Sequence, residues 1–304
     1  MKVTLAGITL ANPIIAASGT FGYGIEFEEI VNLEHLGGFV TKGISLQAME
    51  GNRAPRLIQT AAGMLNAIGL QNVGVEDFIA TKLDALKKYP RANVIVNVFG
   101  NTVGDYVAVV ERLNHAEGIA AYELNVSCPN VHAGGMALGS DAGSLEYLVG
   151  RVKAISKRPL IVKLSPNVTS IAQMAQISES SGADAVSLVN TFMAMSIDVE
   201  TRQPRLTNIT GGLSGPAIKP IALRMVWETA RAVKIPILGM GGIINPEDAV
   251  EFLLAGATAV QVGTASYADP RATERLAKGL ESWCRGHHVE SVTSLTKALE
   301  IPKP

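Results

Sequence analysis

The chain has 304 residues, of which 47% are hydrophobic and 17% charged, and its formal net charge is −1. This balance argues against nucleic acid or an anionic membrane as the main partner, and the low charge excludes an intrinsically disordered protein. Two cysteines, Cys128 and Cys284, are too few for a disulfide framework, a four-cysteine zinc site or an iron–sulfur cluster held by this chain alone. We therefore expect a reducing compartment, namely the cytoplasm.

The uncharged segment 3–25 has the length of a signal peptide or a membrane span. Polar and helix-breaking residues such as Asn12 and Pro13 interrupt it, and it has no sustained leucine-rich stretch. We therefore expect no membrane anchor, but a short strand pair followed by a buried strand at 14–17.

Eight short apolar runs alternate with longer amphipathic segments along the rest of the chain. The apolar runs are 14–17, 38–42, 93–99, 122–127, 160–165, 185–190, 235–240 and 259–264. The helix-like segments are 26–35, 75–88, 103–116, 143–156, 169–181, 217–233, 246–255 and 270–285. Strands that are apolar throughout are typical of a parallel sheet buried on both faces. Eight strand–helix repeats predict an α/β fold of the (β/α)8 TIM-barrel type. No linker or charge block divides the chain, so we expect a single domain over 1–304.

Three connections are longer than barrel turns: 43–74, 128–142 and 191–216. Each follows the C-terminal end of a strand, and this face carries the active site in such barrels. The second and third are rich in Gly, Ser, Asn and Met, as is typical of a mobile lid.

Polar residues stand where the apolar strands end. They are Ser18, Lys42, Asn97, Asn125, Ser127, Lys163, Ser165, Asn190 and Thr191. Asn and Ser often only satisfy loop backbone groups. Lys42 and Lys163 resist that explanation, because a lysine among apolar residues needs an anion or an acidic partner, and neither has an acidic neighbour in sequence. We therefore predict that the two lysines bind a ligand.

Glycine-rich turns follow the last two strands, at 239–242 and at 263–264. These two loops form the usual phosphate site of TIM barrels, where backbone N–H groups close on phosphate oxygens. Tight turns alone would also explain the glycines, but their position after the correct strands favours a phosphate site.

Cys128 ends the fourth strand, in a loop with no charged residue before Asp141. A free cysteine is usually an inert core residue, but this position favours a base or a nucleophile. His132 is more often a solvated loop residue, and Cys284 is interpreted as structural. The chain has no dinucleotide-binding glycine motif, no P-loop and no metal-spaced cluster, so we predict neither a Rossmann NAD site nor a metal.

Motifs along the whole chain resemble the class 1 dihydroorotate dehydrogenases, flavin enzymes of pyrimidine synthesis. They are ANPIIAASGTFGYG (11–24), TKGIS (41–45), NAIGLQN (66–72), VNVFGN (96–101), ELNVSCPN (123–130), VKLSPN (162–167), LVNT (188–191), GGLSGPAIKP (211–220), GMGGI (239–243) and QVGTA (261–265). NAIGLQN, together with Cys rather than Ser at 128, resembles the NAD-linked class 1B catalytic subunit.

The resemblance implies an FMN across the barrel mouth with dihydroorotate beside it. The matching FMN contacts are Ser18, Lys42, Gly43, Asn97, Asn125, Lys163, Val189, Gly215, Gly241, Gly242, Gly263 and Thr264. The matching substrate contacts are Lys42, Asn66, Ala67, Ile68, Gly69, Leu70, Asn125, Asn190 and Thr191. Cys128 would take the proton from C5 while hydride leaves C6 for the flavin, and Lys163 would stabilise the reduced ring.

The resemblance also implies a heterotetramer. It consists of a homodimer of catalytic subunits flanked by two electron-transfer subunits, which carry FAD and a [2Fe–2S] cluster and reduce NAD+. Three alternatives stay open: a class 1A homodimer that uses fumarate, a flavin-free phosphate-binding barrel isomerase or aldolase, and a catalytically inactive binding barrel. Segment 192–210 could serve as a lid, a dimer contact or a partner contact.

Overall fold

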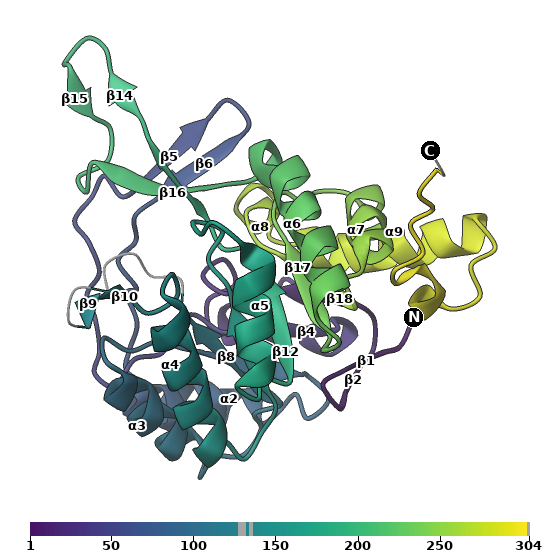
Figure 1. Cartoon of the computed structure of the whole chain (residues 1–304), viewed down its shortest axis with the longest axis horizontal. Coiled ribbons are helices and arrows are strands. Elements are labelled where there is room, and N and C mark those ends of the chain that lie inside the picture. Colours follow the sequence, from purple (N-terminus) through teal and green to yellow (C-terminus); the bar gives the residue numbers. More distant parts are fainter. Residues whose placement is uncertain (127–131, 134–135, 303–304) are drawn as a thin grey trace.

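A closed barrel of eight parallel strands forms the centre of the computed structural model, which describes residues 1–126, 132–133 and 136–302 (Figure 1). The barrel strands follow chain order: β3 (Ile14–Ala16), β4 (Gly38–Val40), β7 (Val94–Val98), β8 (Ala121–Asn125), β11 (Leu160–Lys163), β12 (Ala185–Leu188), β17 (Ile237–Met240) and β18 (Ala259–Val262). Pairing of Val260 with Ile14 closes the ring. The predicted TIM barrel is therefore confirmed, strand by strand.

Burial explains why the barrel strands are apolar throughout. Apart from the last residue of β8, every residue in these eight strands is buried. One face of each strand packs into the barrel interior and the other face packs against helices. Burying this apolar surface stabilises the fold by about 25 cal/mol per Å². Polar residues inside such a barrel therefore need a specific partner.

The outer layer consists of helices that follow the strands. The main ones are α3 (Val103–Leu113), α4 (Ala142–Ile155), α5 (Ile171–Ser180), α6 (Lys219–Ala232), α7 (Pro246–Ala255) and α9 (Ala272–Gly286). Capping boxes begin α3 at Thr102 and α7 at Asn245, where the cap side chain and an aspartate three residues later bond each other's backbone. Short helical turns complete the set: η4 (Pro216–Ile218), α8 (Ala265–Ala268) and η5 (Val292–Leu295).

The predicted helix over 26–35 is wrong. The segment contains two short 3₁₀ helices, η1 (Ile25–Phe27) and η2 (Leu33–His35). Asn32 breaks the run, because its backbone is extended and its side chain accepts a hydrogen bond from the Glu34 N–H, which starts a new turn. The segment 75–88 is helical from Val75 to Leu86, as predicted. It is not one regular α-helix, because a π-helical stretch, η3 (Phe78–Leu83), separates α1 (Val75–Asp77) from α2 (Asp84–Leu86).

The N-terminal segment forms the predicted strand pair, β1 (Val3–Leu5) with β2 (Ile8–Leu10), followed by barrel strand β3. Among residues 1–126, 132–133 and 136–302, no helix has the length and apolar character needed to cross a membrane.

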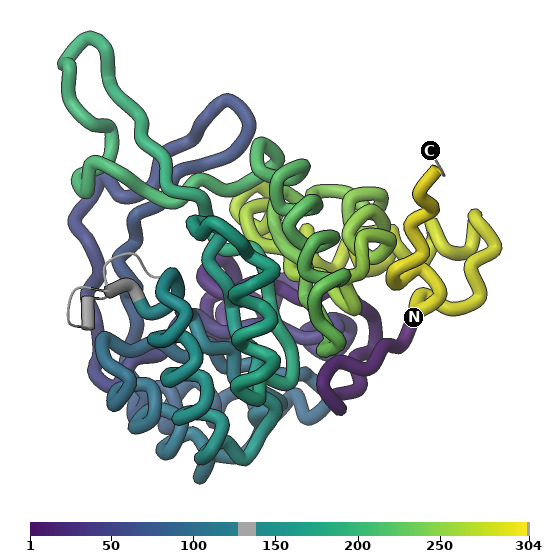
Figure 2. Tube along the Cα trace, viewed as in Figure 1, coloured from purple at the N-terminus to yellow at the C-terminus, as the bar shows by residue number. Residues whose placement is uncertain are grey.

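Two of the long connections meet in a second sheet beside the barrel mouth. Strands β5 (Leu57–Thr60) and β6 (Gly63–Asn66) come from 43–74, and β13 (Phe192–Met195) and β16 (Thr210–Ser214) come from 191–216. They pair antiparallel in the order β13-β16-β6-β5. The hairpin β14 (Ile197–Asp198) and β15 (Gln203–Pro204) projects beyond this sheet, as the tube in Figure 2 shows at the upper left. In the remaining connection, 128–142, β9 (His132–Ala133) pairs with β10 (Met136–Ala137).

Candidate functional site

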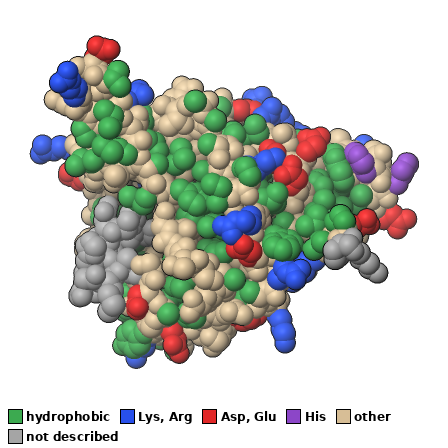
Figure 3. All heavy atoms as spheres, turned by 45° about the horizontal axis from the view of Figure 1, so that its top comes forward, with side chains coloured by type: hydrophobic (Ala, Val, Ile, Leu, Met, Phe, Trp, Pro, Cys, Tyr) green, Lys and Arg blue, Asp and Glu red, His purple; other side chains and the backbone are tan. Residues whose placement is uncertain are grey.

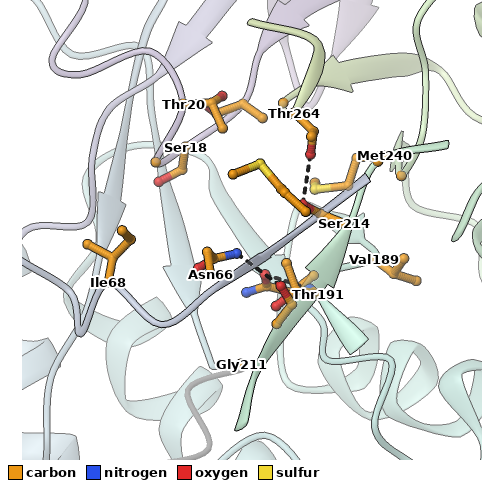
Figure 4. A pocket seen from close by; sticks show the side chains of 18 of the residues that line it. Ser18, Thr20, Asn66, Ile68, Val189, Thr191, Gly211, Ser214, Met240 and Thr264 are labelled. Atoms are coloured by element: carbon orange, nitrogen blue, oxygen red, sulfur yellow. Dashed lines mark hydrogen bonds between the residues drawn. The ribbon is translucent and has the colours of Figure 1, made fainter. Parts of the chain in front are cut away.

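A cavity of about 310 Å³ lies where the barrel strands end, between these ends and the second sheet (Figure 4). It is lined by every residue predicted to contact cofactor or substrate except Asn97 and Cys128. Asn97 is fully buried at the C-terminal end of β7, and Cys128 lies outside the described residues. The fold thus brings residues from seven of the eight barrel strands or their loops, all but β7, and from β6 and β16 to one pocket, while their individual roles stay predictions.

A buried carboxyl group that sequence reasoning missed lies beneath the pocket, behind Lys163 and Gln261, which line it. Glu123 is fully buried on β8, and its Oε1 lies 3.9 Å from Nζ of Lys163 on β11. Lys163 therefore has an acidic partner 40 residues away in sequence, on the adjacent strand, and needs no ligand anion to balance its charge. One feature of the sequence could have identified Glu123: it is the single acidic residue in the apolar run predicted as a buried strand at 122–127.

Three further barrel side chains donate hydrogen bonds to Glu123. The Asn97 amide donates over 2.7 Å, the Gln261 amide over 2.7 Å and the Ser187 hydroxyl over 2.9 Å. Gln261 and Ser187 were also missed by sequence reasoning, since each lies in the middle of an apolar run. Together with Lys163, side chains of five strands therefore share one polar cluster under the pocket.

Lys42 stands at the end of β4 in a different environment. Within the described part of the chain, no carboxylate lies within ion-pair distance of its ammonium group, and its side chain is half-buried. Burial, and secondarily the positive charge of Arg56, lowers the pKa of Lys42 below its ordinary value. An anionic ligand in the pocket would offset both effects, as the sequence predicts.

Asparagine side chains gather on the side of the pocket next to the second sheet. The Asn190 amide donates to Oδ1 of Asn125 over 3.4 Å, and its own Oδ1 accepts the Thr191 N–H over 2.8 Å. The Asn66 amide donates to the Gly212 carbonyl over 3.2 Å, which ties β6 to β16 next to Thr191 (Figure 4). The arrangement offers amide donors and acceptors to a planar polar ligand.

The glycine turns after β17 and β18 form the opposite end of the pocket. Gly241 and Gly242 have φ of 130° and 78°, which glycine adopts readily, and a Cβ at either would lie within 2.8 Å of another side chain. Gly263 differs, because a Cβ there would meet nothing in the protein closer than 3.5 Å. A Cβ at 263 would therefore make only ordinary van der Waals contacts with Ala17 and Thr20, so this glycine relieves no clash. Next to it, the Thr264 hydroxyl donates to the Ser214 hydroxyl over 2.8 Å (Figure 4).

Comparison with known proteins gives one consistent family. A family model described as dihydroorotate dehydrogenase matches residues 1–283. The chain is 54% identical over 301 residues to the dihydroorotate dehydrogenase B (NAD(+)) catalytic subunit of Geobacter sp. strain M21, covering 99% of this chain and 98% of that one. It is 53% identical over 300 residues to the protein of the same name from Pelobacter propionicus, with the same coverage. A putative dihydroorotate dehydrogenase A (fumarate) of Solibacter usitatus is 53% identical over 301 residues, 99% of each chain. These matches confirm the resemblance seen in the motifs.

The environment of Lys42 predicts a pH-dependent effect on stability. Because its pKa is lowered in the folded chain, the charged side chain destabilises the ligand-free fold below that pKa, and the cost disappears as the pH approaches lysine's ordinary value of 10.5. Lys42→Met should therefore raise the free energy of unfolding at pH 7, and the difference from wild type should shrink toward pH 10.5. Urea denaturation at several pH values measures this, with the exposed Lys157→Met as the matched control. A loss of stability for Lys42→Met at pH 7 would contradict it.

Proposed function

The chain belongs to the dihydroorotate dehydrogenase family, and from this we infer that it oxidises dihydroorotate to orotate in pyrimidine biosynthesis, as the catalytic subunit of an NAD+-linked enzyme. The observation that carries this function is the pocket itself, which unites Lys42, Lys163, the asparagine cluster and the glycine turns. A flavin-free isomerase or aldolase would not need this set. The fumarate-dependent class remains the weaker alternative, favoured by the name of the Solibacter relative.

We propose FMN as the flavin. Two observations support the fit. Gly263, beside Thr264, has no side chain to cover its backbone, so a phosphate there would reach backbone N–H groups. The buried Asn97 Oδ1 and Gln261 Oε1 have no hydrogen-bond partner within the described part of the protein. The residues proposed to hold FMN are the twelve that the resemblance implies, from Ser18 and Lys42 to Gly263 and Thr264.

The proposed roles divide along the pocket. Bound FMN supplies a hydride acceptor for the hydrogen at C6 of dihydroorotate. Lys42, whose charge has no nearby carboxylate, binds the substrate carboxylate, and Asn125 and Asn190 orient the pyrimidine ring by their amides. Cys128, which follows β8, takes the C5 proton; this assignment rests on the family motif, because Cys128 lies outside the described residues. The second sheet flanks the bound ring and limits the access of water.

An anaerobic visible spectrum tests the proposed function. The purified chain, reconstituted with FMN, should show an oxidised flavin band that bleaches when dihydroorotate is added. A band that persists would retain the cofactor but overturn the substrate. If the chain takes up no FMN, the flavin assignment is wrong, and the flavin-free isomerase or aldolase becomes the better-supported function.

The proposed base predicts a pH profile. An ordinary thiol has a pKa of about 8.5 and is mostly protonated at neutral pH, so the rate of flavin reduction should rise with pH. Cys128→Ser should lower that rate at pH 7 by about a hundredfold or more and move the rise to higher pH, because an alcohol is a far weaker acid. Stopped-flow reduction measures both, with Cys284→Ala as the control that keeps the wild-type profile. An unchanged profile in Cys128→Ser would exclude Cys128 as the base.

We propose the heterotetramer that the resemblance implies, in the cytoplasm. The relatives' names specify a catalytic subunit, which supports a partner subunit. The FAD and [2Fe–2S] cluster belong on that partner, since this chain has two cysteines.

Strand β13 and the projecting hairpin β14–β15 carry the surface that we propose for the contact between two catalytic subunits. Met193, Met195, Ile197 and Val199 alternate along one strand direction and are 46–78% exposed. The same hairpin bears both acidic and basic side chains, such as Asp198 and Arg202. Figure 3 shows red and blue side chains among the others at the tip of this projection, at the upper left. An apolar surface with charges of both signs can pair with a copy of itself across a two-fold axis.

Charges placed on this surface should separate the dimer. Ile197→Asp combined with Val199→Asp should halve the mass measured by light scattering, because two buried carboxylates would face the same apolar surface of the other copy. Tyr147→Asp, at an exposed aromatic residue of α4, is the control and should remain dimeric. A double variant that stays dimeric would place the contact elsewhere.

A further inference from the structure

Beneath the pocket, the carboxyl group of Glu123 is surrounded by donors. Oε1 accepts from the Asn97 amide, with Lys163 Nζ at 3.9 Å, and Oε2 accepts from the Gln261 amide and the Ser187 hydroxyl. All four of these partners are at least 95% buried, and Glu123 has no exposed surface. A fully buried acid costs stability unless its partners are complete, so this cluster needs a reason beyond packing.

The donors around Glu123 fix the direction of two amide groups. A carboxylate accepts hydrogen bonds and donates none, so the –NH₂ ends of Asn97 and Gln261 must face it. Their carbonyl oxygens therefore point the other way. This orientation follows from chemistry alone and does not depend on how the oxygen and nitrogen positions of an amide are distinguished.

Both of these carbonyl oxygens are buried acceptors without a partner among the described residues. They are Asn97 Oδ1 and Gln261 Oε1. Gln261 lines the pocket, and Asn97 Oδ1 lies 3.0 Å from where a Cβ on Gly43, another pocket residue, would stand. Buried acceptors are nearly always satisfied in folded proteins, so two unsatisfied ones at one pocket floor indicate a ligand donor.

We propose that Glu123 is a positioning residue for the flavin: it turns the Asn97 and Gln261 amides so that their oxygens are presented as hydrogen-bond acceptors to N–H and O–H donors of the bound cofactor. The proposal rests on the proposed function, because the flavin is its ligand. The pyrimidine half of a flavin ring carries an N–H donor, and its side chain carries hydroxyl donors. Lys163 keeps the cluster near neutral, so that the acid does not repel electrons added to the ring.

Flavin affinity and reduction potential are the two quantities that a positioning role would change. In Glu123→Gln, the new side chain has its own –NH₂ group, so either neighbouring amide can turn over and withdraw its oxygen. We expect the dissociation constant of FMN to rise about tenfold or more, as loss of one such hydrogen bond implies. The midpoint potential should move to a more positive value, because the buried negative charge is lost while Lys163 remains.

The experiment titrates apo-protein with FMN by fluorescence quenching and measures the potential with redox dyes. Ser187→Ala is the matched control: it removes one hydrogen bond to Glu123 but leaves both amides in place, so its FMN affinity should stay within about twofold of wild type. Gln261→Met is the second variant, which removes one acceptor and leaves Glu123 intact. Gln261→Met should weaken FMN binding, and it tests the proposal if Glu123→Gln does not fold.

The outcomes separate the possibilities. Unchanged affinity and potential in Glu123→Gln, with reduced stability alone, would show a merely structural acid and overturn the proposal. If Glu123→Gln does not fold, unchanged affinity in Gln261→Met overturns it. If wild type itself binds no FMN, the proposed function fails and the positioning role fails with it; if wild type binds FMN and dihydroorotate bleaches it, only the role of Glu123 is at stake.

Discussion

Closure of the barrel is the constraint on which the rest of the structure depends. Parallel pairing through all eight strands, completed between β18 and β3, sends every strand's C-terminal end to the same mouth. Residues as distant in sequence as Ser18, Lys163 and Thr264 thereby line one pocket. The same closure creates an interior without solvent, where a polar group persists only with partners. The Glu123 cluster supplies those partners from β7, β8, β11, β12 and β18.

The barrel and most of its pocket could be predicted from the sequence because they depend on local patterns. Apolar runs with β-branched residues specify buried strands, and a polar residue at the end of such a run falls at the mouth by geometry alone. Lys42 and the glycine turns were found in this way. The motif resemblance extended the set to Asn66, Gly215 and their neighbours, and the comparisons confirm the family from which that set was taken.

The rest depends on contacts between distant segments, which a single sequence does not display. Lys163 was expected to need a ligand anion, yet its partner Glu123 lies on the next strand in the parallel ladder. The four-stranded sheet could not be predicted from the sequence for the same reason. Strands β6 and β16 are short, and their pairing joins connections about 150 residues apart. The helix expected over 26–35 failed locally, because Asn32 competes with the helix by capping a new turn.

The joining of β6 to β16 ties the pocket to the order in which the protein is made. Strand β6, which carries Asn66, leaves the ribosome early, but its partner strand β16 forms only after residues 210–214 have been made. The barrel closes later still, when β18 pairs with β3. Until then no surface of the chain combines the amide cluster with the glycine turns. A chain that ends before β18 therefore has no complete place for a flavin, so uptake of the yellow cofactor would mark chains that have been synthesised past Tyr267 and whose barrel has closed.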